Sequence, residues 1–242
     1  MLTFETHPTW QDARAWIELG WTVRPDYSHV WDLREPERVL SEMNREKRRA
    51  IKHAEQQFTF DCDDRAETLD AFLPLYHQTM FKFSWRPSPK WEAIFRKRFH
   101  WLVARERGHL YIARASNGEL MGGVVALLSR EDETVYLHRQ GSHPDFVAAN
   151  GVPALYWHVA RAVAGNFRWV DFGGSPQPSL GRFKDFLGAK AVLHFNVTHC
   201  NDPRRWQMYQ TALTLKDATY NFLMRWARRP IQLWLHRKYA AT

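Results

Sequence analysis

The fold is decided by the stretch from Thr134 to Ser175, which reads TVYLHRQGSHPDFVAANGVPALYWHVARAVAGNFRWVDFGGS. The segment Thr134 to His138 is rich in the residue types of a β-strand. Asn150-Gly151-Val152-Pro153 then predicts the start of a helix, with Asn150 as the N-cap and the proline in the first turn. The short apolar run that ends in Asp171-Phe172-Gly173-Gly174 predicts a buried strand. Strand, helix and strand in this order predict two parallel strands joined by a right-handed crossover.

The residues before this stretch predict an antiparallel meander. Two further strand patterns, His109–Ala115 and Leu120–Leu128, precede Thr134. Turn residues at Ser116-Asn117-Gly118 and from Arg130 to Glu133 separate the three strands, so each strand is expected to pair with the next. The fold class that we predict is therefore α/β with a mixed sheet, antiparallel first and then parallel across one crossover.

The remaining segments alternate between helical and extended patterns. Helices are expected over Pro8–Leu19, Glu35–Gln56, Leu69–Phe81, Lys90–Arg105, Leu180–Leu187 and Arg204–Tyr239, the last bent at Pro230. Extended segments are expected over Trp21–Leu33, with a break near Pro25, and over Phe58–Cys62 and Ala191–Thr198. Together they add N-terminal and C-terminal helical extensions to the predicted sheet.

Length and composition predict one domain. The chain has 242 residues, of which 45% are hydrophobic, which is enough for one substantial core. No repeat, low-complexity tract or Gly/Ser linker divides the sequence. We expect a single domain over 1–242, with an N-terminal helical and extended segment at 1–57, a core at 58–200 and basic, aromatic C-terminal helices at 201–242.

Charge and cysteine content indicate which binding partners and which cellular compartment to expect. Lys and Arg total 34 against 26 Asp and Glu, and the resulting charge of +8 favours anionic partners such as phosphates, RNA or an acidic membrane face. Cys62 and Cys200 lack the Cys-x-x-Cys spacing of zinc or dithiol sites, so we expect reduced thiols and no metal. Without a signal peptide or a run of ~20 apolar residues, the chain is expected to be cytoplasmic, or peripheral at the inner membrane surface.

Two groups of motifs resemble the Fem-like branch of the GNAT acyltransferases. The family's DFGGS…FK…G block resembles Asp171-Phe172-Gly173-Gly174-Ser175, followed by Phe183-Lys184 and Leu187-Gly188-Ala189. The family's entry segment resembles Trp31-Asp32-Leu33, followed by the basic helix from Lys47 to Glu55. The motifs occur in the family's order between about Val30 and Thr198.

This resemblance implies a GNAT-like fold and an enzyme, a single-domain N-acyltransferase. Such an enzyme moves an acyl or aminoacyl group from an acyl-CoA or an aminoacyl-tRNA to the amine of a small molecule or peptide, and binds no tight cofactor. The loop from Gln140 to Asp145 lacks the glycine spacing with which acetyl-CoA users hold phosphates. Fem-like proteins share this departure, and some of them use aminoacyl-tRNA.

Four residues are candidates for catalysis. Lys184, in the family block, is expected to steady a developing oxyanion or grip a donor phosphate, against the alternative of a solvated lysine. Asp171 follows a parallel strand and either orients the amine or the lysine, or caps the next turn. Tyr136 and His138 lie two apart on one strand and so share a face. His138 is either a base or a histidine satisfied within the sheet.

A second group of residues is expected to bind the donor or the acceptor. Asn150 and Gly151 begin a helix whose N-terminus can take an anionic group. Arg139, Tyr156 and Phe183 are expected near the opening of the same binding cleft. A basic ridge on the predicted Glu35–Gln56 helix either holds phosphate or tRNA backbone or is merely solvated; it consists of Arg45, Arg48, Arg49 and Lys52.

The C-terminal segment 220–239 interleaves aromatic and basic residues. This composition is suited to an anionic membrane surface or to RNA, although the same helix can instead pack on the domain through its aromatic side. It supports an alternative function of another class, a non-catalytic GNAT-fold module that binds RNA or an anionic membrane lipid.

Overall fold

The structure is a computed structural model. It describes residues 2–215 except 11, 83–86, 176, 203, 205, 209–210 and 213–214. The chain forms two compact units, one made of Met1–Thr6, Asp12–Arg24 and Asn196–Thr242, the other of His7–Gln11 and Pro25–Phe195. The C-terminal segment 220–239, for which a membrane or RNA role is predicted, lies outside the described residues, as does most of the expected helix Arg204–Tyr239.

Eight strands form one mixed sheet in the order β1-β8-β2-β7-β6-β5-β4-β3. Their bounds are β1 (Leu2–Glu5), β2 (Thr22–Asp32), β3 (Phe58–Cys62), β4 (Gly108–Ala115), β5 (Leu120–Ser129), β6 (Thr134–Ser142), β7 (Trp169–Gly174) and β8 (Lys190–His199). Strands β3 to β6 pair antiparallel as the predicted meander. Strands β6 and β7 pair in parallel. The predicted mixed α/β sheet with its parallel crossover is confirmed.

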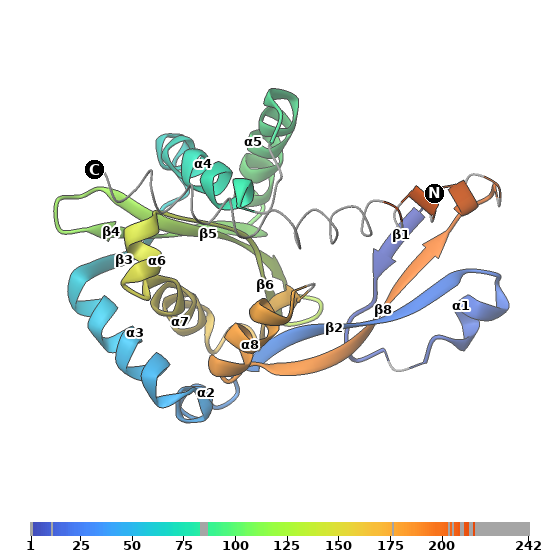
Figure 1. Cartoon of the computed structure of the whole chain (residues 1–242), viewed down its shortest axis with the longest axis horizontal. Helices are drawn as coiled ribbons and strands as arrows, with labels where there is room; N and C mark the ends of the chain where they lie inside the picture. Colours follow the sequence, from blue (N-terminus) through green and yellow to red (C-terminus); the bar gives the residue numbers. More distant parts are fainter. Residues whose placement is uncertain are drawn as a thin grey trace. The chain divides into compact units, whose positions relative to one another are not determined.

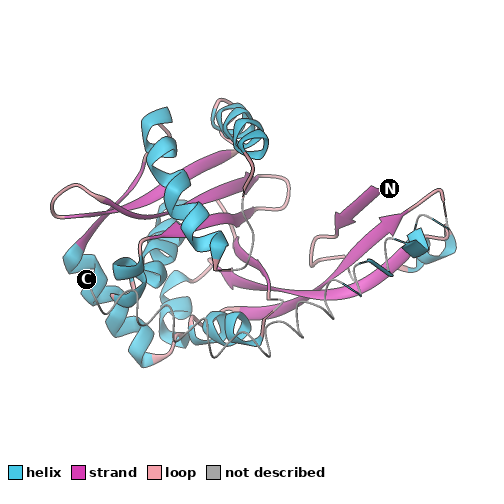
Figure 2. Cartoon of the chain, turned by 45° about the horizontal axis from the view of Figure 1, so that its top comes forward, coloured by secondary structure: helices cyan, strands magenta, loops and turns pink. Residues whose placement is uncertain are grey.

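Eight helices accompany these strands among the described residues. They are α1 (Arg14–Glu18), α2 (Pro36–Glu42), α3 (Arg45–Gln57), α4 (Ala66–Phe81), α5 (Pro89–Val103), α6 (Pro144–Ala148), α7 (Gly151–Val163) and α8 (Pro178–Phe186). In the larger unit, α4 and α5 lie on one face of the β4–β5 region and α3, α6 and α7 on the other (Figure 1). Figure 2 shows the same arrangement by secondary structure, with helices on both sides of the strands. No described helix combines the length and apolar character of a membrane span.

Several predicted boundaries are wrong for local reasons. The expected helix Pro8–Leu19 is helical only over α1, because the carboxylate of Asp12 accepts the backbone N–H of Arg14 and the helix starts after it. The expected helix Glu35–Gln56 is two helices, since Asn44 caps α3 by accepting the backbone N–H of Glu46 at 2.8 Å. Strand β2 continues through Pro25, whose fixed φ is compatible with extended backbone.

The segment after the third meander strand is more ordered than its turn-forming residues suggested. Strand β6 runs on to Ser142, and α6 follows at once. Phe146 of α6 is fully buried and fits between two glycines: its ring would come within 2.7 Å of a Cβ at Gly122 and 2.1 Å of one at Gly151. Burial of this aromatic ring explains why the loop forms a helix.

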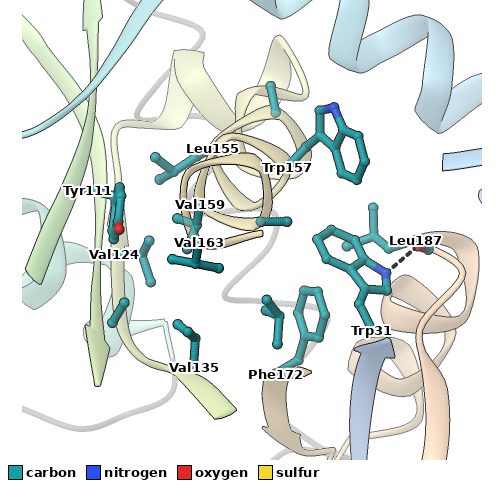
Figure 3. Packing of buried hydrophobic residues seen from close by; sticks show 14 of the residues in the cluster. Trp31, Tyr111, Val124, Val135, Leu155, Trp157, Val159, Val163, Phe172 and Leu187 are labelled. Atoms are coloured by element: carbon teal, nitrogen blue, oxygen red, sulfur yellow. Dashed lines mark hydrogen bonds between the residues drawn. The ribbon is translucent and has the colours of Figure 1, made fainter. Parts of the chain in front are cut away.

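The core on the α7 side fixes α8 against the sheet through Trp31 of β2. The Trp31 indole N–H donates to the carbonyl of Leu187, directly after α8, at 2.8 Å (Figure 3). Its ring packs edge-on against Phe172 of β7, with centroids 4.6 Å apart, and against Trp157 of α7 at 6.0 Å. One side chain thereby ties β2, β7, α7 and the end of α8 together, which sets the position of the helix that carries Lys184.

The smaller unit is held by aromatic contacts of its own. Phe4 of β1 packs edge-on against Trp16 and Trp21, with centroids 5.2 and 6.0 Å apart. Trp21 stacks on His199 of β8 at 4.7 Å. These contacts account for two of the tryptophans of the chain as packing residues.

Candidate functional site

The parallel strands β6 and β7 separate soon after they meet. Their pairing ends with Tyr136 opposite Asp171. Beyond that point β6 continues against β5 to Ser142, whereas β7 pairs with β2 as far as Gly174 opposite Ser28. The carboxyl ends of parallel strands that diverge in this way are where α/β proteins bind ligands.

Lys184 and Asp171 meet at this strand end but engage different partners. The Lys184 ammonium donates to the carbonyls of Gly173 and Gly174, each at 2.7 Å. The Asp171 carboxylate accepts from the Ser28 hydroxyl and from the backbone N–H of Gly173, the latter at 2.6 Å. Of the two roles expected for Asp171, this geometry matches the cap on the following turn.

The glycine pair is required by the backbone. Gly173 has φ of 72°, a left-handed conformation that favours glycine. It lies where the β2–β7 register shifts, because Ser28 faces Gly174 while Val30 faces Asp171. The resulting irregularity turns the Gly173 and Gly174 carbonyls toward Lys184 of α8. We call Ser28, Asp171, Gly173, Gly174 and Lys184, together with His29, the strand-end cluster.

Burial tunes the electrostatics of this cluster. Lys184 is only 7% exposed, and this burial lowers its pKa to about 8, opposed by the negative charge of Asp171. His29 is 7% exposed, and burial together with the Lys184 charge lowers its pKa. An ammonium has three donors, so Lys184 keeps one beyond the two given to the carbonyls.

His29 and Ser28 belong to the site but were missed from the sequence. The His29 Nδ1 lies 3.3 Å from the Ser175 hydroxyl, and its Nε2 lies 3.5 Å from the Asp185 carboxylate. Ser175 belongs to the DFGGS…FK block, and Asp185 directly follows its lysine. No local pattern around residue 28 indicates this, because the contact depends on strand β2 pairing with β7.

A second junction joins the predicted residues Asn150 and Phe183 through Lys47. The Lys47 ammonium donates to the Asn150 side-chain carbonyl at 2.9 Å and lies 5.9 Å from the centre of the Phe183 ring. Asn150 has φ of 55° and its side chain makes no capping bond to α7, since it accepts from Lys47 instead. Lys47, which lies in the basic motif but was not singled out, therefore links α3, α7 and α8.

The N-terminus of α7 is closed by packing. Gly151 and Pro153 are buried, and the Phe146 ring lies against Gly151. Tyr156, one turn further along α7, packs edge-on against Phe172 with centroids 5.4 Å apart, and burial raises its pKa. The Phe146 ring thus packs against the first residue of this helix.

The remaining candidates on β6 lie toward α5. The β5–β6 register shifts at His138, because Val125 faces Arg139 while Ala126 faces Leu137. This bulge directs both His138 and Arg139 into a pocket of about 250 Å³ beside α5. His138 is exposed at the rim of this pocket, and partial desolvation together with the charge of Arg139 lowers its pKa.

The Arg139 guanidinium Nε in this pocket is buried without a hydrogen-bond partner in the structure. Tyr136 lies apart from the bulge, with its hydroxyl 3.5 Å from the Asp132 carboxylate. Burial raises the Tyr136 pKa to about 12, so it is protonated at neutral pH. The structure therefore places Tyr136 beside Asp171 in register, and His138 with Arg139 in a different pocket.

The basic ridge of α3 divides into two kinds of residue. Arg48 is half-buried and donates to the carbonyls of Leu40 and Ser41, which end α2. Arg45, Arg49 and Lys52 are exposed and form no ion pair with any residue that the structure describes. We call these three the α3 cationic face. They begin close to α8, since the Asn44 backbone N–H donates to the Phe186 carbonyl at 2.9 Å.

Comparison with known protein families gives one match. The family model described as "Acetyltransferase (GNAT) domain" matches residues 41–185, which contain α3, the meander, α7 and the segment from Asp171 to Lys184. A comparison with curated proteins finds no significant match.

Several solved structures are similar in fold to this chain. FemX aligns with a TM-score of 0.60 at 12% identity, over 70% of this chain and 61% of its own length. The C-terminal (DUF2156) domain of a putative lysylphosphatidylglycerol synthetase from Agrobacterium fabrum has a TM-score of 0.56 at 12% identity, covering 87% and 69% of the two chains. L-PGS from Bacillus licheniformis has a TM-score of 0.53 at 11% identity, over 80% of this chain and 66% of its own length. At these identities the likeness establishes the fold.

Proposed function

The chain belongs to the acetyltransferase (GNAT) domain family, and from that premise we propose that it is an N-acyltransferase that takes an aminoacyl group from aminoacyl-tRNA and passes it to an amine. The GNAT fold predicted from the sequence, with its likeness to Fem-like proteins, is confirmed. The donor and the acceptor are the proposed part.

The observation that carries the proposal is the strand-end cluster. A buried ammonium, held by two carbonyls at the point where β6 and β7 separate, offers positive charge where a carbonyl oxygen becomes an oxyanion. Such a group stabilises the transition state of acyl transfer more than the neutral ester. Lys184 is therefore our candidate for the oxyanion-stabilising residue.

The reaction balances with few protein groups. The amine nitrogen attacks the ester carbonyl of the donor, and a C–N bond forms. The bond between the carbonyl carbon and the ribose oxygen then breaks, and the ribose hydroxyl receives a proton in place of the one that the amine loses. Positioning the two reactants supplies most of the acceleration that such a transfer needs.

Two features favour a tRNA donor over an acyl-CoA. Phe146 packs against Gly151 at the start of α7, and the preceding segment lacks the glycine-rich loop with which GNAT proteins of the acetyl-CoA type bind diphosphate. The α3 cationic face presents Arg45, Arg49 and Lys52 to solvent near α8, which suits a nucleic-acid backbone. One protein of the same fold bears the name of a putative lysylphosphatidylglycerol synthetase, whose product as named carries a lysyl group.

Ligand-induced stabilisation tests the donor. The full chain is heated with equal concentrations of aminoacyl-tRNA, deacylated tRNA, acetyl-CoA and longer acyl-CoAs; a ligand present at about 100 times its dissociation constant stabilises by roughly 2.7 kcal/mol. We expect the two tRNA samples to raise Tm and the acyl-CoAs to leave it unchanged. A response to acyl-CoA alone would overturn the tRNA part of the proposal.

Transfer itself is tested with tRNA charged with labelled amino acids and a mixture of amines and peptides. An amide product keeps its label in mild base, whereas an ester product loses it. Label that enters base-stable product with wild type, and not with Lys184→Met, supports the proposal. If tRNA binds but no acceptor is ever labelled, the alternative of a non-catalytic RNA-binding module replaces it.

A further inference from the structure

We propose that Cys62, Asp64 and His109 form a binding site for a thiophilic divalent metal ion, Zn²⁺ above all. Cys62 lies at the end of β3, Asp64 in the turn that follows and His109 on β4. None of them belongs to the strand-end cluster. Their ligand atoms all lie within 4.8 Å of one another. This inference goes beyond acyl transfer and does not depend on it.

The register of two antiparallel strands creates the cluster. Cys62 of β3 faces Tyr111 of β4, and the backbone N–H of Asp63 continues the ladder by donating to the Leu110 carbonyl at 2.9 Å. The regular pairing ends there, because the Leu110 backbone N–H donates to the Asp64 carboxylate. Tyr111 and His109 alternate along β4, so His109 projects from the same side of the sheet as Cys62, and the Asp64 carboxylate lies against it.

The side chains of the cluster are already ordered. One carboxylate oxygen of Asp64 accepts the backbone N–H of Leu110 at 2.7 Å, and the other lies 2.7 Å from Nδ1 of His109. The Asp64 and His109 side chains are 22% and 28% exposed, so they are partly desolvated, while Cys62 is open to solvent. A carboxylate fixed from behind leaves its outer oxygen directed at the imidazole and the thiol.

The donor set selects the class of ion. Thiolate, imidazole and carboxylate together suit Zn²⁺ and its chemical relatives, whereas Mg²⁺ and Ca²⁺ prefer sets made only of oxygen. Tetrahedral zinc places its ligand atoms roughly 3.4 to 3.7 Å apart. Reaching that spacing from the present one needs side-chain shifts of about 1 Å. The exposed side of Cys62 leaves the fourth position to water.

Binding replaces protons by metal, with no change of oxidation state. The thiol loses its proton as the sulfur–metal bond forms, and the proton shared between His109 and Asp64 leaves as nitrogen and oxygen turn to the ion. Both protons pass to solvent. The ion would clamp edge strand β3 to β4 at the start of α4.

The test uses tag-free full chain, stripped with chelator, kept reduced and titrated with Co²⁺. Cobalt bound by a thiolate gives an intense sulfur-to-metal charge-transfer band, so the band reports the cysteine directly. We expect saturation at one Co²⁺ per chain, loss of the band on adding Zn²⁺, and no band in Cys62→Ser or His109→Gln. The matched control is Cys200→Ser, whose thiol lies against the Asp202 carbonyl and whose band should equal that of wild type.

A second readout keeps the test independent of folding defects. Zn²⁺ at about 100 times its dissociation constant should raise the Tm of wild type by about 5 °C or more and leave that of Cys62→Ser unchanged, and Mg²⁺ should affect neither. The exposed serine substitution is not expected to unfold the chain. Absence of the cobalt band in wild type, or its persistence in Cys62→Ser, would overturn the proposal.

Discussion

The strand-end cluster and the α3 cationic face use positive charge in opposite ways. Lys184 is buried, donates to two carbonyls at 2.7 Å and has its pKa lowered to about 8. Arg45, Arg49 and Lys52 are exposed and make no ion pair within the described part of the chain. The first arrangement fixes one charge at one point, and the second attracts a large anion without fixing it. Removing the first should therefore affect the chemical step, and removing the second should affect binding.

Substitution of Lys184 has the largest expected effect. Lys184→Met should lower kcat for transfer by about 100-fold or more, the scale of losing one oxyanion donor. It should also cost about 0.5–1.5 kcal/mol of stability for each of the two hydrogen bonds that the Gly173 and Gly174 carbonyls lose. Kinetics with labelled aminoacyl-tRNA, together with urea denaturation, measure both effects.

The matched control for this variant is Lys190→Met. Lys190 is exposed and pairs with Glu42 at 3.2 Å, so its removal should change kcat and stability little. Equal kcat in the Lys184 and Lys190 variants would show that the buried charge takes no part in transfer.

Trp31 tests whether the buried cluster depends on its supporting core. Trp31→Phe keeps an aromatic ring but leaves the Leu187 carbonyl without its donor, which should cost about 1–3 kcal/mol in urea denaturation. Because Trp31 holds the end of α8, kcat should fall as well, while the salt dependence of tRNA binding should stay as in wild type. If tRNA binding changed while kcat did not, the strand-end cluster would not depend on Trp31.

The pH dependence of transfer distinguishes the two kinds of charge. Lys184 loses its proton above about pH 8, so kcat should decline above that value, tending to tenfold per pH unit. Lys184→Arg keeps its charge, and its decline should move to higher pH. A decline that is the same in both proteins would belong to another group.

The same shift has a consequence for stability. The folded-state pKa of about 8 lies below the unfolded value of roughly 10.4, so folding favours the neutral amine. The proton-linked part of the Lys184 contribution, which is separate from its hydrogen bonds to Gly173 and Gly174, is therefore complete above about pH 10.4 and is lost as pH falls through about 8. Comparing denaturation of wild type and Lys184→Met at pH 7 and pH 10 measures it.

The α3 cationic face should give the smallest effect. Arg45→Ala with Arg49→Ala should weaken tRNA binding several-fold at low salt and reduce the slope of log Kd against log salt by roughly 0.7–0.9 for each phosphate that is no longer neutralised. The kcat at saturating donor should remain unchanged. Arg34→Ala is the control, because Arg34 is engaged with Asp32 by two hydrogen bonds of about 3 Å.

The sequence predicted those parts of the site that local pattern determines. The glycine pair after Asp171 and the nearby Lys184 lie within one short block, so the motif shows them together. Ser28 reaches the same cluster from 143 residues away through the pairing of β2 with β7, and His29 follows it. Nothing near these two residues in the sequence indicates that pairing.

Residues that differ only in which way they face were predicted less well. Lys47 and Arg48 are adjacent cations on α3, yet Lys47 reaches Asn150 and Arg48 reaches the end of α2. Helix packing decides between them, and sequence periodicity does not resolve it. The Asn44 cap that divides the expected Glu35–Gln56 helix is a local signal and could have been recognised.

Hydrogen–deuterium exchange of the full chain with and without aminoacyl-tRNA tests the central claim most directly. Donor bound at the strand-end cluster should slow exchange of the amides from Asp171 to Phe186 and in the first turns of α3, and should leave β3 and the start of β4 unchanged. Protection confined to β3, β4 or α5, with the Asp171–Phe186 amides exchanging as in the free protein, would contradict the account.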